Sequence, residues 1–476
     1  MNIIGRKAEI TELNEYLNSA QSEFIAIYGR RRVGKTFLIT QLIGNKFAFD
    51  VTGDLRGKTK EHLFYFNEAL RRYGYSFPQG RPNNWLSAFA ALQDLLEKNT
   101  TYKTQIVFFD ELPCFDTTNS GFLGAFEHFW NSWASRRPSF KLIVCGSATS
   151  WMLDNIIDNR GGLHNRLTHS IHLHPFTLKV VEEYLKAKDF VWTRHDIVQA
   201  YMAFGGIPYY LNLLKPSESV AQNISRLCFN AGNEGLTNEY PRLYKSLFRK
   251  PEPYMQIVAL LAKTKEGLTR KQIAEGMKLQ SGKNLTALLK NLVNCDFIRV
   301  YNVHTQKKLN TQGIYQLTDF FTLFYHSFMK RGITDPNYWM SLLSTHTFTT
   351  WQGLAFERVC MAHVPQIKKK LKIDGIYTEY YSWRCTKPSE KAQIDLIIER
   401  ADKIINICEI KFSDNYYSMS KADYDKLQRR IELFRNDTNC RLGIMQTLIT
   451  TLPTPNSKYN NAIPNIVTMD DLFENT

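Results

Sequence analysis

Short apolar runs alternate with amphipathic helical segments in the N-terminal part of the chain. The runs lie at residues 24–28, 46–52, 105–109, 141–145 and 170–176. Continuous apolar runs of this length are typical of strands that are buried on both faces of a parallel sheet. The alternation therefore predicts a doubly wound α/β sheet, in which ligands bind at the carboxyl ends of the strands.

Helical periodicity replaces this alternation after the fifth run. Residues 180–202 are helical in pattern, and a glycine-proline turn at 204–211 opens a further helix. This part of the chain, residues 179–250, is interpreted as a small helical lid. A lid can cover a bound nucleotide, but a plain helical connector would have the same pattern.

The next segment has the pattern of a DNA- or protein-binding module. Three short helical stretches and a strand-like run follow one another between residues 254 and 303. This order predicts a winged helix-turn-helix over 251–330. Its third helix would present Ser281, Lys283 and Asn284 to DNA, although many winged helices bind protein instead.

The first apolar run leads into a glycine-bounded basic loop. Gly29, Gly34, Lys35 and Thr36 occupy the fixed positions of the motif G-x-x-x-x-G-K-[ST]. Backbone N–H groups of such a loop surround the α- and β-phosphates, the lysine reaches the β- and γ-phosphates, and the hydroxyl binds Mg²⁺. The predicted ATP-binding residues of the loop are Gly29, Arg30, Arg31, Arg32, Val33, Gly34, Lys35, Thr36 and Phe37. The three arginines either help to hold the triphosphate or only solvate the loop.

Two further runs end in polar residues that a P-loop ATPase requires. Asp110 and Glu111 follow the run 105–109, where Asp110 can bind Mg²⁺ and Glu111 can act as the general base for the attacking water. Ser147 follows the run 141–145 and can contact the γ-phosphate, with Thr149 as the second choice. Together with the phosphate loop, these residues predict ATP hydrolysis.

The last part of the chain carries a second group of carboxylates. Glu357 lies on a predicted helix, Asp395 on a predicted strand, and Glu409 and Lys411 on one face of the next strand. Carboxylates that converge can hold Mg²⁺ or Mn²⁺ for phosphodiester hydrolysis, and a lysine beside them can stabilise the developing charge. Glu357, Asp395 and Glu409 are therefore candidate metal ligands. A hairpin with a charged edge and a Glu–Lys pair is the simpler alternative.

Composition narrows the class of protein. The chain has 476 residues, a formal net charge of +15 and eight scattered cysteines. It has neither the apolar run of a membrane-spanning helix nor a secretory signal, so we expect a cytoplasmic protein with reduced thiols. The positive charge favours a polyanionic partner such as DNA.

Taken together, these motifs resemble the archaeal-type ATPase family of the AAA+ and STAND-like P-loop proteins. The resemblance implies a five-stranded parallel P-loop core over 1–178. It also implies that backbone near Ile4 and Arg6 contacts adenine. In related ATPases an arginine from a neighbouring subunit completes the site, which implies a homo-oligomer and assigns that role to Arg166, although Asn165 precedes it where the family has a small residue.

The segment 331–476 resembles the PD-(D/E)XK nuclease-like domain, which has a restriction-endonuclease-like α/β fold. The resemblance rests on Glu357, Asp395 and the pair Glu409 and Lys411, with Ile394 in place of the usual proline before the aspartate. The predicted function is therefore an ATPase that acts on or with DNA and carries a Mg²⁺-dependent endonuclease. The alternative is an ATP-gated signalling or DNA-binding switch whose nuclease-like domain is catalytically silent.

Overall fold

The chain forms two compact units in the computed structural model, and each is described by itself. Unit 1 consists of Met1–His174 and Lys245–Arg249, and unit 2 of Pro175–Tyr244 and Lys250–Thr476. The described residues are 3–99, 103–147, 149–158, 161–230, 235–278, 283–301, 313–385 and 392–475. The predicted core 1–178 thus corresponds mainly to unit 1, and most of the other three predicted segments lies in unit 2.

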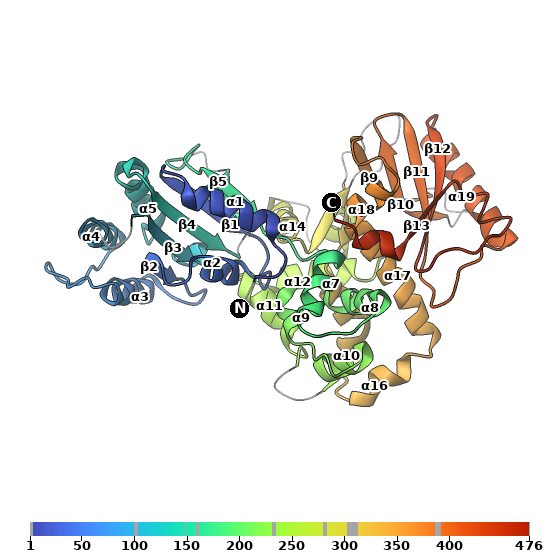
Figure 1. Ribbon diagram of the computed structural model, residues 1–476, viewed down its shortest axis with the longest axis horizontal. Helices are drawn as coiled ribbons and strands as arrows, with labels where there is room; N and C mark the ends of the chain where they lie inside the picture. The colour runs from blue at the N-terminus through green and yellow to red at the C-terminus, as the bar shows by residue number, and fades with distance from the viewer. Residues whose placement is uncertain are drawn as a thin grey trace. The chain divides into compact units, whose positions relative to one another are not determined.

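Unit 1 is built on the parallel sheet that the apolar runs predicted (Figure 1). Its strands are β1 (Glu23–Tyr28), β2 (Phe47–Thr52), β3 (Gln105–Asp110), β4 (Phe140–Gly146) and β5 (His169–His172). They lie in the order β2-β3-β4-β1-β5, and every neighbouring pair is parallel. The predicted five-stranded parallel sheet is confirmed, and it places the phosphate loop and the ends of β3 and β4 at one edge.

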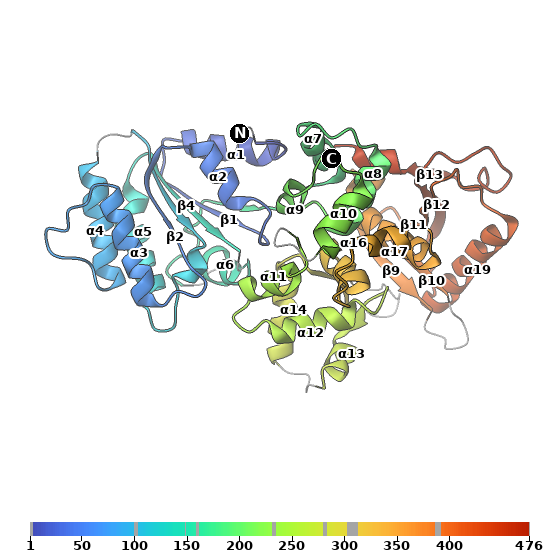
Figure 2. The same ribbon diagram turned by 90° about the horizontal axis from the view of Figure 1, so that it is seen from below.

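Helices on unit 1 bury a large aromatic core against this sheet. The helices are α1 (Lys7–Asn18), α2 (Lys35–Ile43), α3 (Thr59–Arg72), α4 (Trp85–Lys98), α5 (Phe122–Ser132) and α6 (Thr149–Met152). Short 3-10 helices lie at Leu112–Cys114 and Ala134–Arg136, and a π-helical turn lies at Leu153–Ile157. α3 packs on β2 and α4, and α4 packs on α5 (Figure 2). Phe66, Phe89 and Phe126 of these helices surround Phe109 of β3. This core holds the strand end from which Asp110 projects.

Unit 2 begins with helices and a small antiparallel sheet. The elements are α7 (Leu178–Lys186), α8 (Arg194–Phe204), α9 (Pro208–Asn212), α10 (Val220–Phe229), α11 (Glu239–Leu247, whose last residues belong to unit 1), α12 (Glu252–Leu261), β6 (Leu268–Thr269), α13 (Arg270–Gly276), α14 (Lys283–Asn294), β7 (Ile298–Tyr301) and β8 (Ile314–Leu317). The strands pair in the order β6-β8-β7. Ser281 and the Lys283 side chain lie outside the described residues. The assignment of this segment as a winged helix-turn-helix stays a prediction.

Aromatic helices lead into the C-terminal sheet. After α15 (Phe320–Phe324), the turn Tyr325–Met329 and α16 (Pro336–Leu342) come α17 (His346–Ala362), α18 (Val364–Lys370), β9 (Thr378–Arg384), β10 (Gln393–Arg400), β11 (Ile404–Lys411), α19 (Lys421–Thr438), β12 (Gly443–Thr450), β13 (Asn465–Thr468) and the turn Met469–Phe473. The order is β13-β12-β11-β10-β9; β9, β10 and β11 are antiparallel, whereas β11, β12 and β13 are parallel. α17 packs against β10 and β11. The sheet is therefore mixed, and its nuclease-like assignment stays a prediction.

Among the helices of the described residues, none has the length and apolar composition that a membrane crossing requires.

Substitution of Phe109 tests whether the aromatic core supports the end of β3. Phe109 is fully buried, whereas Phe64 on α3 is 54% exposed. We expect Phe109→Ala to lower the free energy of unfolding by about 3–5 kcal/mol, since it leaves a cavity beneath the end of β3. Phe64→Ala should change it by about 0.5 kcal/mol or less. Denaturant unfolding measures both, and equal effects of the two substitutions would contradict this account of the core.

Candidate nucleotide-binding and hydrolysis site

The phosphate loop connects β1 to α2, and its own lysine binds backbone carbonyl oxygens of the loop. Lys35 is only 5% exposed, and its ammonium donates to the carbonyl oxygens of Gly29 at 2.9 Å and Arg30 at 3.1 Å. It also reaches Ser147 Oγ at 3.3 Å. Gly29 has φ +138°, and a side chain there would meet the Leu173 carbonyl oxygen at 2.4 Å, so the close approach requires glycine. The loop is therefore a compact backbone cradle with one buried cation.

The predicted metal ligands of this site lie next to one another. Thr36 Oγ1 at the start of α2 donates to Asp110 Oδ2 at the end of β3, over 2.9 Å. Burial, and to a smaller extent the Glu111 charge, raises the pKa of Asp110 to about 6. A hydroxyl and a carboxylate that are already in contact form an oxygen donor set that fits Mg²⁺.

The ends of β3 and β4 are connected through Glu111 and Ser147. The Ser147 backbone N–H donates to Glu111 Oε2 at 3.0 Å, and the Ser147 hydroxyl donates to Glu111 Oε1. Glu111 adopts a left-handed backbone conformation with φ 49° directly after β3. The residue predicted as general base is thus bound to the residue predicted to contact the γ-phosphate.

Arg6 has a role that the motif did not reveal. Its guanidinium pairs with Glu9 at 3.1 Å and donates to the carbonyl oxygens of Val33 at 3.2 Å and His174 at 2.6 Å. Burial lowers the pKa of Arg6, although Glu9 partly offsets this effect. Arg6 therefore ties α1 and the end of β5 to the phosphate loop. The adenine contact predicted for Ile4 and Arg6 stays a prediction.

The other loop residues differ in their surroundings. Arg30 is 2% exposed and Val33 is buried, whereas Thr36 and Phe37 are exposed at the start of α2. Arg32 is half-buried with φ 73°, and Arg31 is exposed. Of the three arginines, Arg31 is the one that lines the neighbouring cavity. The three arginines of the loop therefore lie in three different environments and do not form one charged surface.

A cavity of about 790 Å³ lies beside the ends of β2, β3 and β4. Its lining includes Arg31, Glu111, Ser147 and, from the segment after α11, Arg249. Arg249 reaches the Asp116 carbonyl oxygen only at 3.5 Å. Two guanidinium groups thus share a cavity with the candidate base. No motif marks Arg249, so sequence analysis missed it.

Arg166 is not brought to this cavity. It lies exposed at the end of the turn that precedes β5, where its backbone N–H donates to the Leu163 carbonyl oxygen at 3.0 Å. An exposed position is what a residue acting on a neighbouring subunit requires, and that role stays a prediction.

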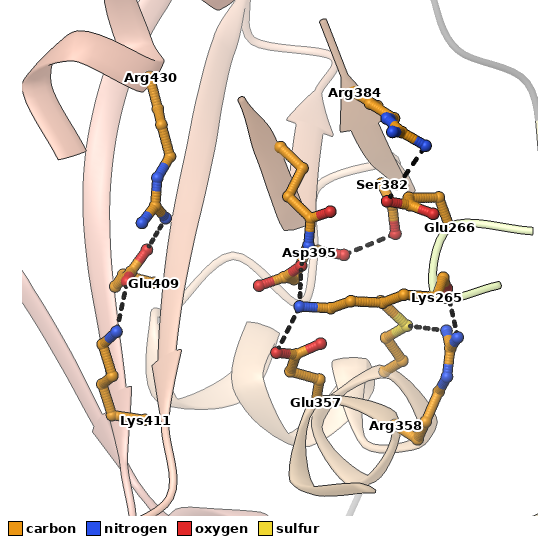
Figure 3. A network of polar contacts seen from close by, with 12 residues as sticks. Lys265, Glu266, Glu357, Arg358, Ser382, Arg384, Asp395, Glu409, Lys411 and Arg430 are labelled. Carbon is orange, nitrogen blue, oxygen red and sulfur yellow. Dashed lines mark hydrogen bonds and ion pairs between the residues drawn. The ribbon is translucent and has the colours of Figure 1, made fainter. Parts of the chain in front are cut away.

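The three candidate metal ligands of unit 2 fall into two separate ion-pair groups (Figure 3). Glu357 of α17 and Asp395 of β10 both bind the Lys265 ammonium, at 2.8 and 2.9 Å. Glu409 of β11 binds Lys411 at 2.9 Å and Arg430 of α19 at 2.6 Å. The two groups involve α17, β10, β11, α19 and the turn between α12 and β6 that carries Lys265.

The three candidate metal ligands of unit 2 are therefore not assembled around one point. Glu357, Asp395 and Glu409, all of them described residues, do not bring three ligand atoms within 4.8 Å of one another. The expected pairing of Glu409 with Lys411 is present, and the expected convergence of Asp395 and Glu409 stays a prediction. Asp395 and Glu409 bind different cations, since Asp395 pairs with Lys265 and Glu409 pairs with Arg430. As they stand, these residues do not fit a shared metal ion.

The charges around Lys265 are uneven. Burial lowers the pKa of Lys265, but the adjacent Asp395 and Glu357 carboxylates outweigh it and raise that pKa above its ordinary value. Burial and the Asp395 charge raise the pKa of Glu357 to about 8. At Glu357 the Lys265 ammonium favours the ionised carboxylate, whereas burial and the Asp395 charge favour the protonated form.

Comparison with known proteins supports the nucleotide site. Residues 3–214 match a family described as an ATPase domain predominantly from Archaea. We refer to residues 3–214 as the ATPase domain, after the family that they match. The matched part contains the phosphate loop, the Asp110–Glu111 pair and Ser147.

One relative is similar to the chain beyond the ATPase domain. The chain is 25% identical over 449 residues to an uncharacterized protein of Methanocaldococcus jannaschii, covering 90% of this chain and 92% of that protein. The Walker-type ATPase PABY2304 of Pyrococcus abyssi has a TM-score of 0.47 and 19% identity, over 68% of this chain and 96% of its own. The ORC2 protein of Aeropyrum pernix, in ADPNP–ADP complexes, has a TM-score of 0.42 and 15% identity, over 69% and 94%.

The buried ammonium of the ATPase domain gives a direct test of nucleotide binding. We expect Lys35→Ala to weaken ATP binding about 30-fold or more, since losing one partner of a buried charged contact costs about 2 kcal/mol or more. Titration calorimetry measures this loss. Lys46→Ala removes an exposed lysine of the same domain and should leave the affinity unchanged. Unchanged affinity in Lys35→Ala would show that the nucleotide does not bind at this loop.

Proposed function

We propose that this protein is a switch that acts on or with DNA, and that ATP hydrolysis in the ATPase domain drives the switch. The observation that carries the proposal is the meeting of three groups at one sheet edge. These are the Lys35 ammonium under the loop, the Thr36–Asp110 pair and the Glu111–Ser147 pair. Phosphate binding, metal binding and proton removal are the three requirements of ATP hydrolysis.

The roles follow from the contacts. The loop N–H groups and Lys35 bind the phosphates of ATP, and the carbonyl contacts of Lys35 exchange for phosphate oxygens. Thr36 and Asp110 would hold Mg²⁺, which would neutralise negative charge on the triphosphate. Glu111 accepts the proton of the attacking water. Because Ser147 binds Glu111 in the nucleotide-free protein, its engagement by the γ-phosphate would release Glu111 for catalysis.

The cavity beside Glu111 suits a departing anion. Arg31 and Arg249 both line it, on the side of the strand ends where the γ-phosphate would lie. Guanidinium groups bind phosphate oxygens through planar, forked hydrogen bonds. We assign Arg31 and Arg249 to stabilise the γ-phosphate as its bond to ADP breaks.

DNA is the proposed partner on two grounds. The formal net charge of +15 attracts a polyanion. The helices α12, α13 and α14 with the small sheet β6-β8-β7 follow the order of a helix-turn-helix module with a wing. The N-terminal end of α14 is proposed to contact the DNA backbone or bases.

The C-terminal sheet is proposed to be nuclease-like but silent in this arrangement. Support for the likeness comes from Glu357 on a helix, Asp395 on a central strand, and Glu409 and Lys411 on the next strand. Support for silence comes from the internal cations, since each of the three carboxylates already binds a lysine or an arginine. The second candidate function is the alternative to silence, an endonuclease that cuts DNA whenever Mg²⁺ is present.

Two assays on the full chain separate these functions. We expect duplex DNA to bind at low salt, with an affinity that falls steeply as salt rises, and to change the rate of ATP turnover. We expect plasmid DNA to stay intact with Mg²⁺ or Mn²⁺. Failure to bind DNA at low salt would remove the DNA part of the proposal. Nicking by the wild type that Asp395→Ala abolishes would establish the second candidate instead.

A further inference from the structure

The turn at residues 262–267, between α12 and β6, carries a lysine into the carboxylate pair of the C-terminal sheet (Figure 3). The Lys265 ammonium lies between Glu357 Oε1 and Asp395 Oδ1, at 2.8 and 2.9 Å. These three residues come from separate parts of unit 2. ATP hydrolysis does not use this contact, and sequence analysis did not anticipate it.

Several buried donors fix the backbone of this turn. Gln316 Nε2 donates to the Lys265 carbonyl oxygen at 2.8 Å, and the buried Arg358 guanidinium donates to the same oxygen. The Tyr301 hydroxyl donates to the Glu266 carbonyl oxygen at 2.6 Å. Gly267 has φ +94°, and a side chain there would meet the Tyr315 carbonyl oxygen at 2.3 Å. The lysine is therefore delivered by a built turn rather than by a loose surface chain.

The carboxylate side of the contact is fixed as well. Gln393 Nε2 donates to Asp395 Oδ1 at 3.0 Å, the same oxygen that binds Lys265. Ser382 Oγ donates to the Asp395 carbonyl oxygen at 2.6 Å. Glu357 is on α17, which packs directly on β10 and β11. Both carboxylates are thus held where a cation can bridge them.

The space around the lysine leaves no room for a second cation. The cavity lined by Lys265, Glu357 and Asp395 has a volume of about 10 Å³. That volume holds at most about one water molecule. A divalent cation that bridges the two carboxylates would occupy the position of the ammonium and would bring its own positive charge against it. Lysine and metal therefore exclude each other.

We propose that Lys265 is an internal plug that takes the place of a divalent cation between Glu357 and Asp395. Displacement of the Lys265 side chain from the two carboxylates opens a site for Mg²⁺ or Mn²⁺. The proposal rests on the proposed function in one respect, because the plug belongs to the segment assigned to DNA contact. DNA binding at that segment is thereby linked to the state of the carboxylate pair.

The test is a Mn²⁺ titration of the full-length protein without nucleotide or DNA, followed by electron paramagnetic resonance. Lys265→Met removes the ammonium and keeps the length of the side chain. We expect this variant to bind one Mn²⁺ at least about 10-fold more tightly than the wild type, a gain that Lys265→Met with Asp395→Asn loses. Lys271→Met is the matched control, since Lys271 lies in the same segment, is 78% exposed and pairs with Glu275 at 3.9 Å.

Two results would overturn the plug. One is equal Mn²⁺ binding by the wild type and a folded Lys265→Met variant, and the other is an extra ion that the Asp395→Asn substitution does not remove. Because neither ATP nor DNA is present, a failure of ATP turnover or of DNA binding would not produce these results.

Amine acylation of the wild type, read by mass spectrometry, keeps the proposal testable if Lys265→Met does not fold. We expect Lys265 to react at least about 10-fold more slowly than Lys271, because its ammonium is bound by two carboxylates. Equal reaction rates for the two lysines would contradict the plug.

Discussion

The hydrogen bonds between Ser147 and Glu111 are the contact on which the nucleotide site depends. They join the ends of two neighbouring parallel strands, and Lys35 reaches the same serine from the phosphate loop. The aromatic core beneath β3 holds Asp110 in place, and Arg6 holds the loop from the side of β5. Residues distant in sequence thus meet at one edge because the sheet is parallel and its strands end together.

The two groups of carboxylates differ in what occupies them. In the ATPase domain, Asp110 accepts from a threonine hydroxyl, and Glu111 accepts from a serine hydroxyl and an N–H group. These donors are neutral, so the negative charge still attracts a metal ion. In unit 2 the partners are a lysine and an arginine, which a cation must displace. This difference explains why Mg²⁺ fits the first site as it stands and does not fit the second.

The parts of the site that lie in continuous motifs could be predicted from the sequence. The five apolar runs became β1 to β5, because a strand buried on both faces needs an apolar side chain at nearly every position. Asp110, Glu111 and Ser147 could then be predicted as site residues, because each lies at the end of a predicted strand. Lys265, Arg249 and Arg430 could not be predicted. A lone cation in a turn or on a helix has the same pattern as a solvated surface charge, and only tertiary packing gives it a partner.

The proposed mechanism of ATP hydrolysis requires that Glu111 removes the proton from the attacking water. Single-turnover hydrolysis of ATP by Glu111→Gln, with ATP affinity measured beside it, tests this most directly. The account predicts that the variant binds ATP with wild-type affinity but cleaves it about 10²–10⁴-fold more slowly, the range for loss of a general base. Cleavage at the wild-type rate would contradict it.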